Sequence, residues 1–144
     1  MDDEQKGIET KEKNVDASKR KSLFRFREWP VYQAAKSFRK KIRELASKLP
    51  EKEKYLIRGQ ISRAADSIGL NIAEGSNKLS DVDFSRYLNN AETSLEEVVA
   101  CLDLILDDGH ISKEEFDGFL TEAENLGAQL IAFGKKVRQQ GSRL

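Results

Sequence analysis

The chain has 144 residues, enough for one domain with a hydrophobic core but not for two. It holds 25 basic and 25 acidic residues, and the resulting net charge of zero argues against a general binder of nucleic acids or membranes. No segment approaches the roughly 18 apolar residues of a membrane-spanning helix, so no membrane association is expected. The single cysteine, Cys101, cannot form an internal disulfide, which favours a reduced, cytoplasmic setting.

Charge is unevenly distributed along the chain. Residues 23–63 hold twelve basic and four acidic side chains, whereas residues 64–134 hold three basic and fifteen acidic ones. A chain polarised in this way can bind a partner of either sign, or a second copy through opposite patches. Solvated helix faces are the simpler interpretation of the same pattern.

Residues 1–22 have only Ile8 and Val15 as sizeable apolar side chains among six basic and six acidic ones. Such a segment buries too little surface to offset the entropy of ordering, so we predict a disordered charged tail. Folding on a partner is the alternative. We assign residues 23–140 to the folded domain and expect residues 141–144 to fray.

The first predicted helix begins at Pro30, a residue that suits the first helical turn, and ends before Pro50. Four aromatic residues precede or open it: Phe24, Phe26, Trp29 and Tyr32. We expect them to cap one end of a bundle core, with stacking on nucleic-acid bases as the alternative. Basic residues on this helix and the next are candidate nucleic-acid contacts: Lys36, Arg39, Lys40, Arg43, Lys54 and Arg58.

The second predicted helix starts near Lys52, and Gly75 suits a left-handed cap at its end. Its apolar side is formed by Ile61, Ala64, Ala65, Ile68 and Ile72. Polar residues at steps of four, four and three form a stripe along it: Arg63, Ser67, Asn71 and Glu74. These four and Gly75 are the candidate motif or interface site.

A structural role is the favoured interpretation of this stripe. Asn71 and Glu74 are expected to bond backbone groups of the following turn. Arg63 is expected to pair with a carboxylate such as Glu96 or Glu97. The alternative is a fixed polar patch at an oligomer interface or pore.

The third predicted helix shows the clearest pattern. Ser80 is its expected N-cap, and the helix is expected to end near Gly109. Its apolar stripe alternates steps of four and three: Phe84, Leu88, Ala91, Leu95, Val98, Leu102 and Ile105. Additional apolar residues lie off the stripe: Val99, Leu104 and Leu106. A helix that is apolar on more than one face of a small bundle is expected to be covered by another subunit.

The fourth predicted helix begins with a capping box formed by Ser112 and Glu115. Its core face is Phe116, Phe119, Leu120, Ala123, Leu126, Leu130, Phe133 and Val137. Four helices joined by short connections predict an all-α, antiparallel, up-down-up-down four-helix bundle.

The sequence contains no motif that supports catalysis. The lone His110 has no Glu-x-x-His partner of the di-iron type, and Cys101 lies in an apolar run that indicates a packed thiol. No nucleophile elbow, phosphate loop or dinucleotide fingerprint occurs. We therefore expect a protein that is not an enzyme and that uses no metal and no cofactor.

The run Arg63–Gly75 resembles the core motif of the bacterial four-helix-bundle family associated with intervening sequences of large-subunit ribosomal RNA. Ser80 and the segments Phe84–Leu88 and Ala91–Glu97 follow as they do in that family, and the resemblance covers roughly residues 26–137. It implies a homo-oligomer, with a pentameric ring as the expected state. The family more distantly resembles accessory proteins of diversity-generating retroelements, which are basic pentamers that bind nucleic acid. This chain lacks their strong positive charge.

Two functional hypotheses remain open. The first is an oligomeric scaffold or interaction module whose partner is another protein. The second is an RNA-binding accessory protein that uses the basic face of the first two helices. The acidic part of the chain would repel a phosphate backbone that wraps around the protein, so the scaffold ranks first.

Overall fold

The computed structural model describes residues 23–51 and 57–140. They form a short 3-10 helix and four α-helices: η1 (Arg25–Glu28), α2 (Pro30–Ser47), α3 (Ile57–Ser76), α4 (Asp81–Asp107) and α5 (Lys113–Gln140). The predicted tail (residues 1–22), the predicted frayed end (residues 141–144) and the expected helix start near Lys52 lie outside the described residues.

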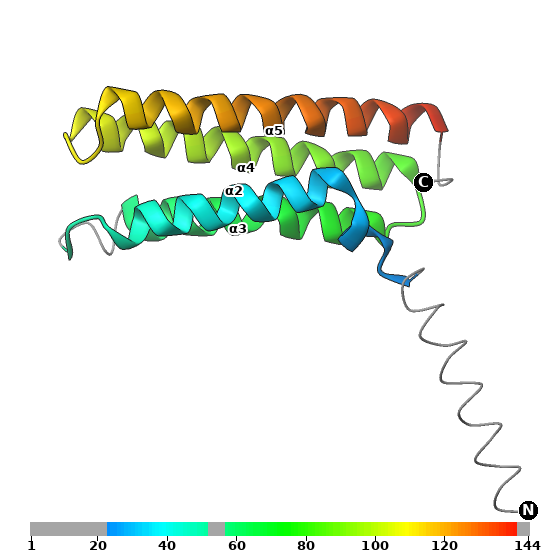
Figure 1. Cartoon of the computed structure of the whole chain (residues 1–144). Helices are drawn as coiled ribbons and strands as arrows, with labels where there is room; N and C mark the ends of the chain where they lie inside the picture. The colour runs from blue at the N-terminus through cyan, green and yellow to red at the C-terminus, as the bar shows by residue number, and fades with distance from the viewer. Residues whose placement is uncertain (1–22, 52–56, 141–144) are drawn as a thin grey trace, which may run out of the picture.

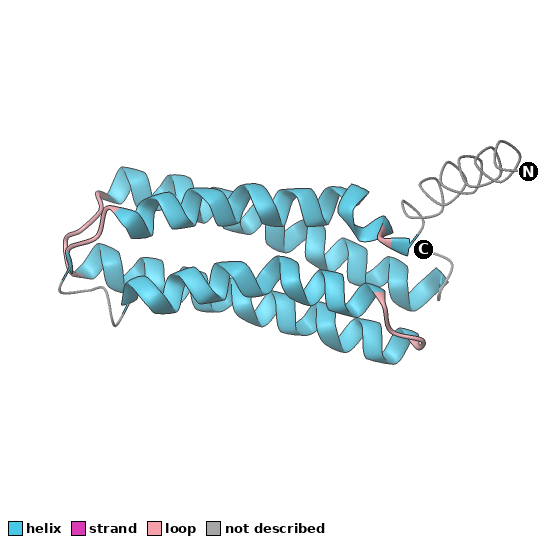
Figure 2. Ribbon diagram, turned by 90° about the horizontal axis from the view of Figure 1, so that it is seen from below, coloured by secondary structure: helices cyan, strands magenta, loops and turns pink. Residues whose placement is uncertain are grey.

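The four helices form an antiparallel bundle, as the sequence predicts (Figure 1). η1, the α3–α4 connection and the last turns of α5 lie at one end, and the α4–α5 turn lies at the other (Figures 1 and 2). α3 packs most extensively against α4, whereas the contact between α2 and α5 is much smaller. The α2–α5 side is therefore the most open side of the bundle.

The helix ends follow the predicted local chemistry. Pro30 occupies the first turn of α2. Ser80 Oγ accepts a hydrogen bond from the backbone N–H of Asp83 at 3.2 Å, which caps α4. At α5, Ser112 Oγ accepts from the Glu115 N–H at 3.0 Å, and Glu115 Oε1 accepts from the Ser112 N–H at 3.2 Å. This reciprocal pair is the predicted capping box.

Every residue of the predicted α4 stripe is buried, which confirms its register. The most deeply buried large side chains come from all four α-helices: Ile42, Ile61, Ile68, Ile72, Val98, Cys101, Leu102, Ile105, Leu130 and Val137. These side chains form one continuous core along the bundle.

An aromatic cluster closes the end of the core nearest η1. The Trp29 ring stacks on Phe84 with centroids 6.0 Å apart and lies 4.9 Å from Phe133. Phe84 and Phe133 meet edge-on at 5.9 Å. The three rings come from the start of α2, the start of α4 and the end of α5, so they tie these segments together. The predicted capping role of Trp29 is confirmed.

The expectation that Gly75 forms a left-handed helix cap is wrong. Gly75 lies inside α3, and the positive φ among the described glycines is found at Gly109, with φ +77°. A Cβ on Gly75 would lie 2.9 Å from Cβ of Tyr87 and 3.0 Å from Cδ1 of Phe84. Glycine is needed here because α4 approaches the α3 backbone, not because the chain turns.

We predict that Gly75→Ala lowers the free energy of unfolding by about 1–2 kcal/mol, because the new methyl group overpacks the α3–α4 contact. The matched control is Gly118→Ala in α5, where a Cβ would meet nothing within 4 Å. This control should gain stability, by about 1 kcal/mol at most, from helix propensity alone. Urea unfolding followed by circular dichroism measures both, and equal shifts would contradict the close-approach explanation.

Candidate functional site

The middle of the polar stripe forms a hydrogen-bonded link between α3 and α4. Asn71 Nδ2 donates to the backbone carbonyl of Ser67 at 2.8 Å and to its hydroxyl at 2.9 Å. Ser94 Oγ lies 2.9 Å from Ser67 Oγ across the helix contact and 3.0 Å from the carbonyl of Asn90. Ser67 is therefore the node of a three-residue polar link.

Two expectations for this stripe are wrong in detail. Asn71 bonds one turn back within α3 instead of bonding the following connection, because Ser67 lies four residues earlier on the same face. The ion pairs of the described residues do not include Arg63, which is exposed, and Glu97 instead accepts a bond from Gln60 Nε2 at 3.2 Å. Glu74 is also exposed, so the ends of the stripe lie on the surface and its middle lies in the helix contact.

Sequence reasoning missed Ser94, which is 9% exposed and is the one buried polar residue of the described core. A signal was available, because Ser94 immediately precedes Leu95 of the apolar stripe and follows Ala91 by three residues. A serine at such a position faces a neighbouring helix. It needs a partner there.

A second cluster joins α2 to α3 through Asp66. Arg39 Nε lies 2.6 Å from Asp66 Oδ1, and Arg43 binds both carboxylate oxygens at 2.9 and 2.5 Å. The hydrogen bonds from Arg43 first, and from Arg39 to a lesser extent, lower the pKa of Asp66 below its ordinary value, against the opposing effect of burial. The same bonds raise the pKa of Arg43.

This cluster changes the interpretation of the basic face. Arg39 and Arg43 already share a carboxylate, so part of their charge is satisfied within the chain. Lys36 and Lys40 are exposed on the same helix, and Arg58 is half-buried at the start of α3. Lys54 lies outside the described residues. The basic surface that remains is smaller than the six candidates suggest.

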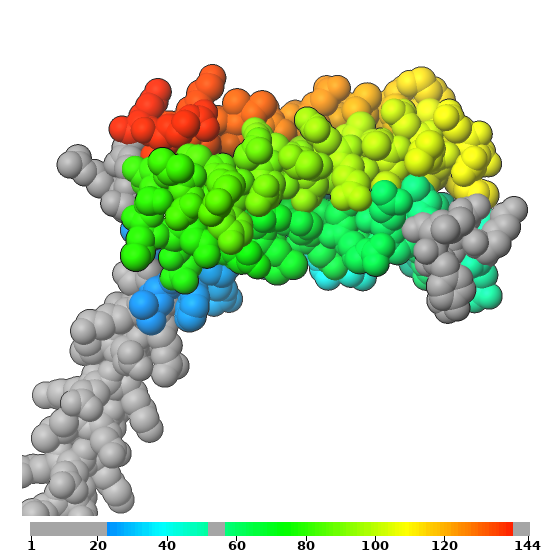
Figure 3. Space-filling view, turned by 180° about the vertical axis from the view of Figure 1, so that it is seen from behind, coloured from blue at the N-terminus to red at the C-terminus, as the bar shows by residue number. Residues whose placement is uncertain are grey.

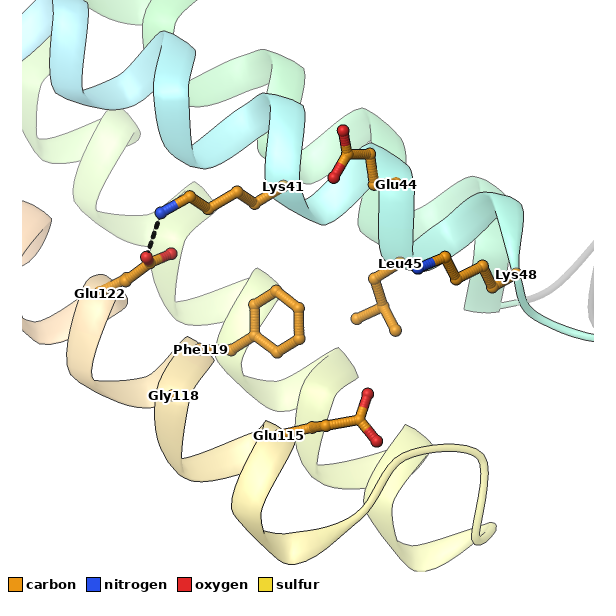
Figure 4. A pocket seen from close by; sticks show the side chains of 8 residues that line it. All are labelled: Lys41, Glu44, Leu45, Lys48, Glu115, Gly118, Phe119 and Glu122. Atoms are coloured by element: carbon orange, nitrogen blue, oxygen red, sulfur yellow. Dashed lines mark hydrogen bonds and ion pairs between the residues drawn. The ribbon is translucent and has the colours of Figure 1, made fainter.

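Two grooves flank α2. The α2–α3 groove has a volume of about 320 Å³, with a floor of Ala35, Ala65 and Gly69 and with Tyr32 and Leu70 beside it. The α2–α5 groove, of about 370 Å³, contains Leu45 and Phe119 between charged side chains. Lys41 forms an ion pair with Glu122 across this second groove (Figure 4). Both grooves are open to solvent.

The remaining reactive side chains do not form a site. Cys101 is buried, and this burial, with a smaller effect of Glu97, raises the pKa of its thiol. His110 lies in the α4–α5 turn. Within residues 23–51 and 57–140, no three His, Cys, Asp or Glu side chains lie together as metal ligands. No helix in that part of the chain combines the length and apolar character needed to cross a membrane.

The fold and the α3–α4 link define a small four-helix-bundle protein. Residues 27–132 match the model of the 23S rRNA-intervening sequence protein family, and the chain belongs to this family. A solved structure of a protein of unknown function from the S23 ribosomal protein family of Bacteroides thetaiotaomicron VPI-5482 is similar, with a TM-score of 0.67 and 27% identity. The match covers 73% of this chain and 98% of that one. No curated protein matches the chain.

We predict that Asp66→Asn lowers stability at neutral pH by about 1 kcal/mol, a small value because both arginines are largely exposed. The native pKa of Asp66 is depressed, so its contribution is present above the ordinary Asp pKa of about 4 and is lost as the pH falls through the native value. Urea unfolding of both proteins from pH 7 down to pH 2 should show their difference shrinking towards zero. The exposed carboxylate variant Glu124→Gln should show little difference at any pH, and a pH-independent effect of Asp66→Asn would contradict the ion-pair account.

We also predict opposite effects for two serine substitutions. Ser67→Ala removes the node of the α3–α4 link and should lower the free energy of unfolding by about 1 kcal/mol. Ser85 Oγ is buried and has no hydrogen-bond partner among the described residues. Ser85→Ala should therefore raise stability by about 1 kcal/mol, because it removes an unsatisfied polar group. Thermal unfolding should show a lower melting temperature for Ser67→Ala and a higher one for Ser85→Ala than for the wild type.

Proposed function

We propose that the protein is a non-enzymatic scaffold that works as a homo-oligomer in the cytoplasm, with a pentamer as the state that the family resemblance implies. The observation that supports this proposal most directly is that opposite charges lie on different helices of a chain whose net charge is zero. α2 carries five basic residues and one acidic one, among them Lys36, Arg39, Lys40 and Arg43, whereas α4 carries seven acidic residues and one basic one. Unlike patches on one molecule favour contact with a second copy.

Exposed apolar side chains on two helices support this proposal. Leu70 on α3 is 61% exposed and Leu104 on α4 is 53% exposed. Single exposed apolar residues are common on monomers. Here, however, Leu104 and the partly buried Leu106 lie off the core stripe of α4, which is the pattern expected for a helix that another subunit covers.

RNA binding is the second candidate, and the exposed Lys36 and Lys40 favour it. Phosphate contacts would come from the outward face of α2 and would weaken steeply with salt. The Asp66 cluster counts against this candidate, because a carboxylate already neutralises part of Arg39 and Arg43. We therefore rank it below self-association.

The test is size-exclusion chromatography with light scattering on protein purified without nuclease, with absorbance recorded at 260 and 280 nm. We expect the mass of several chains and a protein-like absorbance ratio. Excess absorbance at 260 nm that salt removes would instead place RNA binding first. A monomer at all accessible concentrations would overturn the scaffold proposal.

A double variant separates the two candidates further. Lys36→Glu/Lys40→Glu changes charges that lie outside the Asp66 cluster, so the fold should be kept. If RNA binds α2, this variant should lose the 260 nm excess, while Lys135→Glu/Lys136→Glu on α5 serves as the control of equal charge change. Equal effects of the two variants would indicate attraction by overall charge and not a site on α2.

A further inference from the structure

The α2–α3 groove and the outer face of α4 each combine exposed apolar groups with charged ones, and the charges of the two surfaces are opposite in sign. The groove has an apolar floor of Ala35, Ala65 and Gly69, and Leu70 at its edge is 61% exposed. Lys36 and Arg39 line its α2 side and Asp66, which is bonded to Arg39, lines its α3 side, so the lining keeps a net positive charge. An apolar side chain with acidic neighbours would therefore fit this groove.

The outer face of α4 presents such a side chain. Leu104 is 53% exposed, and Asp103, Asp107 and Asp108 beside it are exposed as well. Asp107 and Asp108 follow Leu104 by three and four residues, so they share its helix face. This C-terminal part of α4 is visible on the surface in Figure 3. One protruding leucine is thus surrounded by carboxylates.

We propose that Leu104 and its acidic neighbours on one copy dock into the α2–α3 groove of a second copy. The contact rests on the proposed self-association and identifies the two surfaces that make it. Lys36, which lies outside the Asp66 cluster, attracts the aspartates, and Leu104 covers Leu70 and Tyr32 at the groove. Leu70 and Leu104, which are exposed in the single chain, thereby become buried.

The pairing joins two different patches, so it is heterologous and each copy keeps one free groove and one free Leu104 face. Charge disfavours a symmetric contact in which the same patch of two copies meets. Two acidic α4 faces would repel each other, and so would two rims carrying Lys36 and Arg39. Head-to-tail association follows from the separation of charge between α2 and α4.

Two substitutions at exposed positions test the contact. Leu104→Glu places a further negative charge among the aspartates and removes the apolar side chain that enters the groove. Leu70→Glu places a negative charge at the groove itself. Each variant should lose the oligomer and show the mass of one chain by light scattering, with the circular dichroism spectrum of the wild type. Ile131→Glu is the matched control, because Ile131 is 51% exposed on α5, outside both patches, and its oligomer should remain.

Mixing the two variants gives the sharper result. The Leu104→Glu copy keeps an intact groove and the Leu70→Glu copy keeps an intact Leu104 face, so equal amounts should form a complex of two chains. A wild-type oligomer that survives both substitutions, or an Ile131→Glu variant that dissociates equally, would overturn this interface while leaving the scaffold proposal in place. Variants that remain monomeric when mixed would exclude the head-to-tail arrangement. A wild-type monomer would overturn both proposals.

Discussion

The contact between α3 and α4 is the constraint on which the rest of the structure depends. It is fixed at three levels: Gln60 bonds Glu97, Ser67 meets Ser94, and Gly75 lies against Phe84 and Tyr87. As residue numbers rise along α3 they fall along α4, which is the antiparallel register. Polar bonds specify the first two levels, and the absence of a side chain on Gly75 permits the third. A shift of one residue would remove all three together.

This register positions the other two helices. Phe84, placed beside Gly75, also stacks on Trp29 at the start of α2, and both rings contact Phe133 of α5. On an adjoining face of α3, Asp66 holds two arginines of α2. One face of α3 thus contacts α4 through small and polar groups, and the adjoining face contacts α2 through an ion-pair cluster. α3 is the central element of the bundle.

The periodic part of the fold could be predicted from the sequence. The core stripe of α4 and the caps at Ser80 and Ser112 follow from spacing and local chemistry, because each depends on residues within one or two helical turns. The role of Gly75 could not be predicted in the same way. Glycine near a helix end suits both a left-handed cap and a close helix approach, and only the position of Tyr87 and Phe84 decides between them.

For the candidate site too, local sequence patterns do not reveal contacts with residues that are distant in the chain. The stripe from Arg63 to Glu74 is visible as a spacing, but the partner of its central residue, Ser94, lies 27 positions away from Ser67. The partners of Asp66 are equally remote in sequence, and they turn two of the proposed phosphate contacts into an internal ion-pair cluster. Local patterns therefore identified Ser67 and Asn71 on α3 but missed Asp66, and the packing of α2 and α4 determined what each of these residues does.

Net charge is a poor guide to association for a chain of this kind. A total of zero argues against strong attraction to polyanions, but it also removes the repulsion that keeps like molecules apart. When the opposite charges lie on different helices, as they do on α2 and α4, the unlike patches of two copies attract while their like patches repel. Such a charge distribution favours a heterologous contact. Repetition of a heterologous contact gives either a closed ring or an open filament. We therefore expect the separation of charge between α2 and α4 to favour head-to-tail contact between copies over contact between like faces.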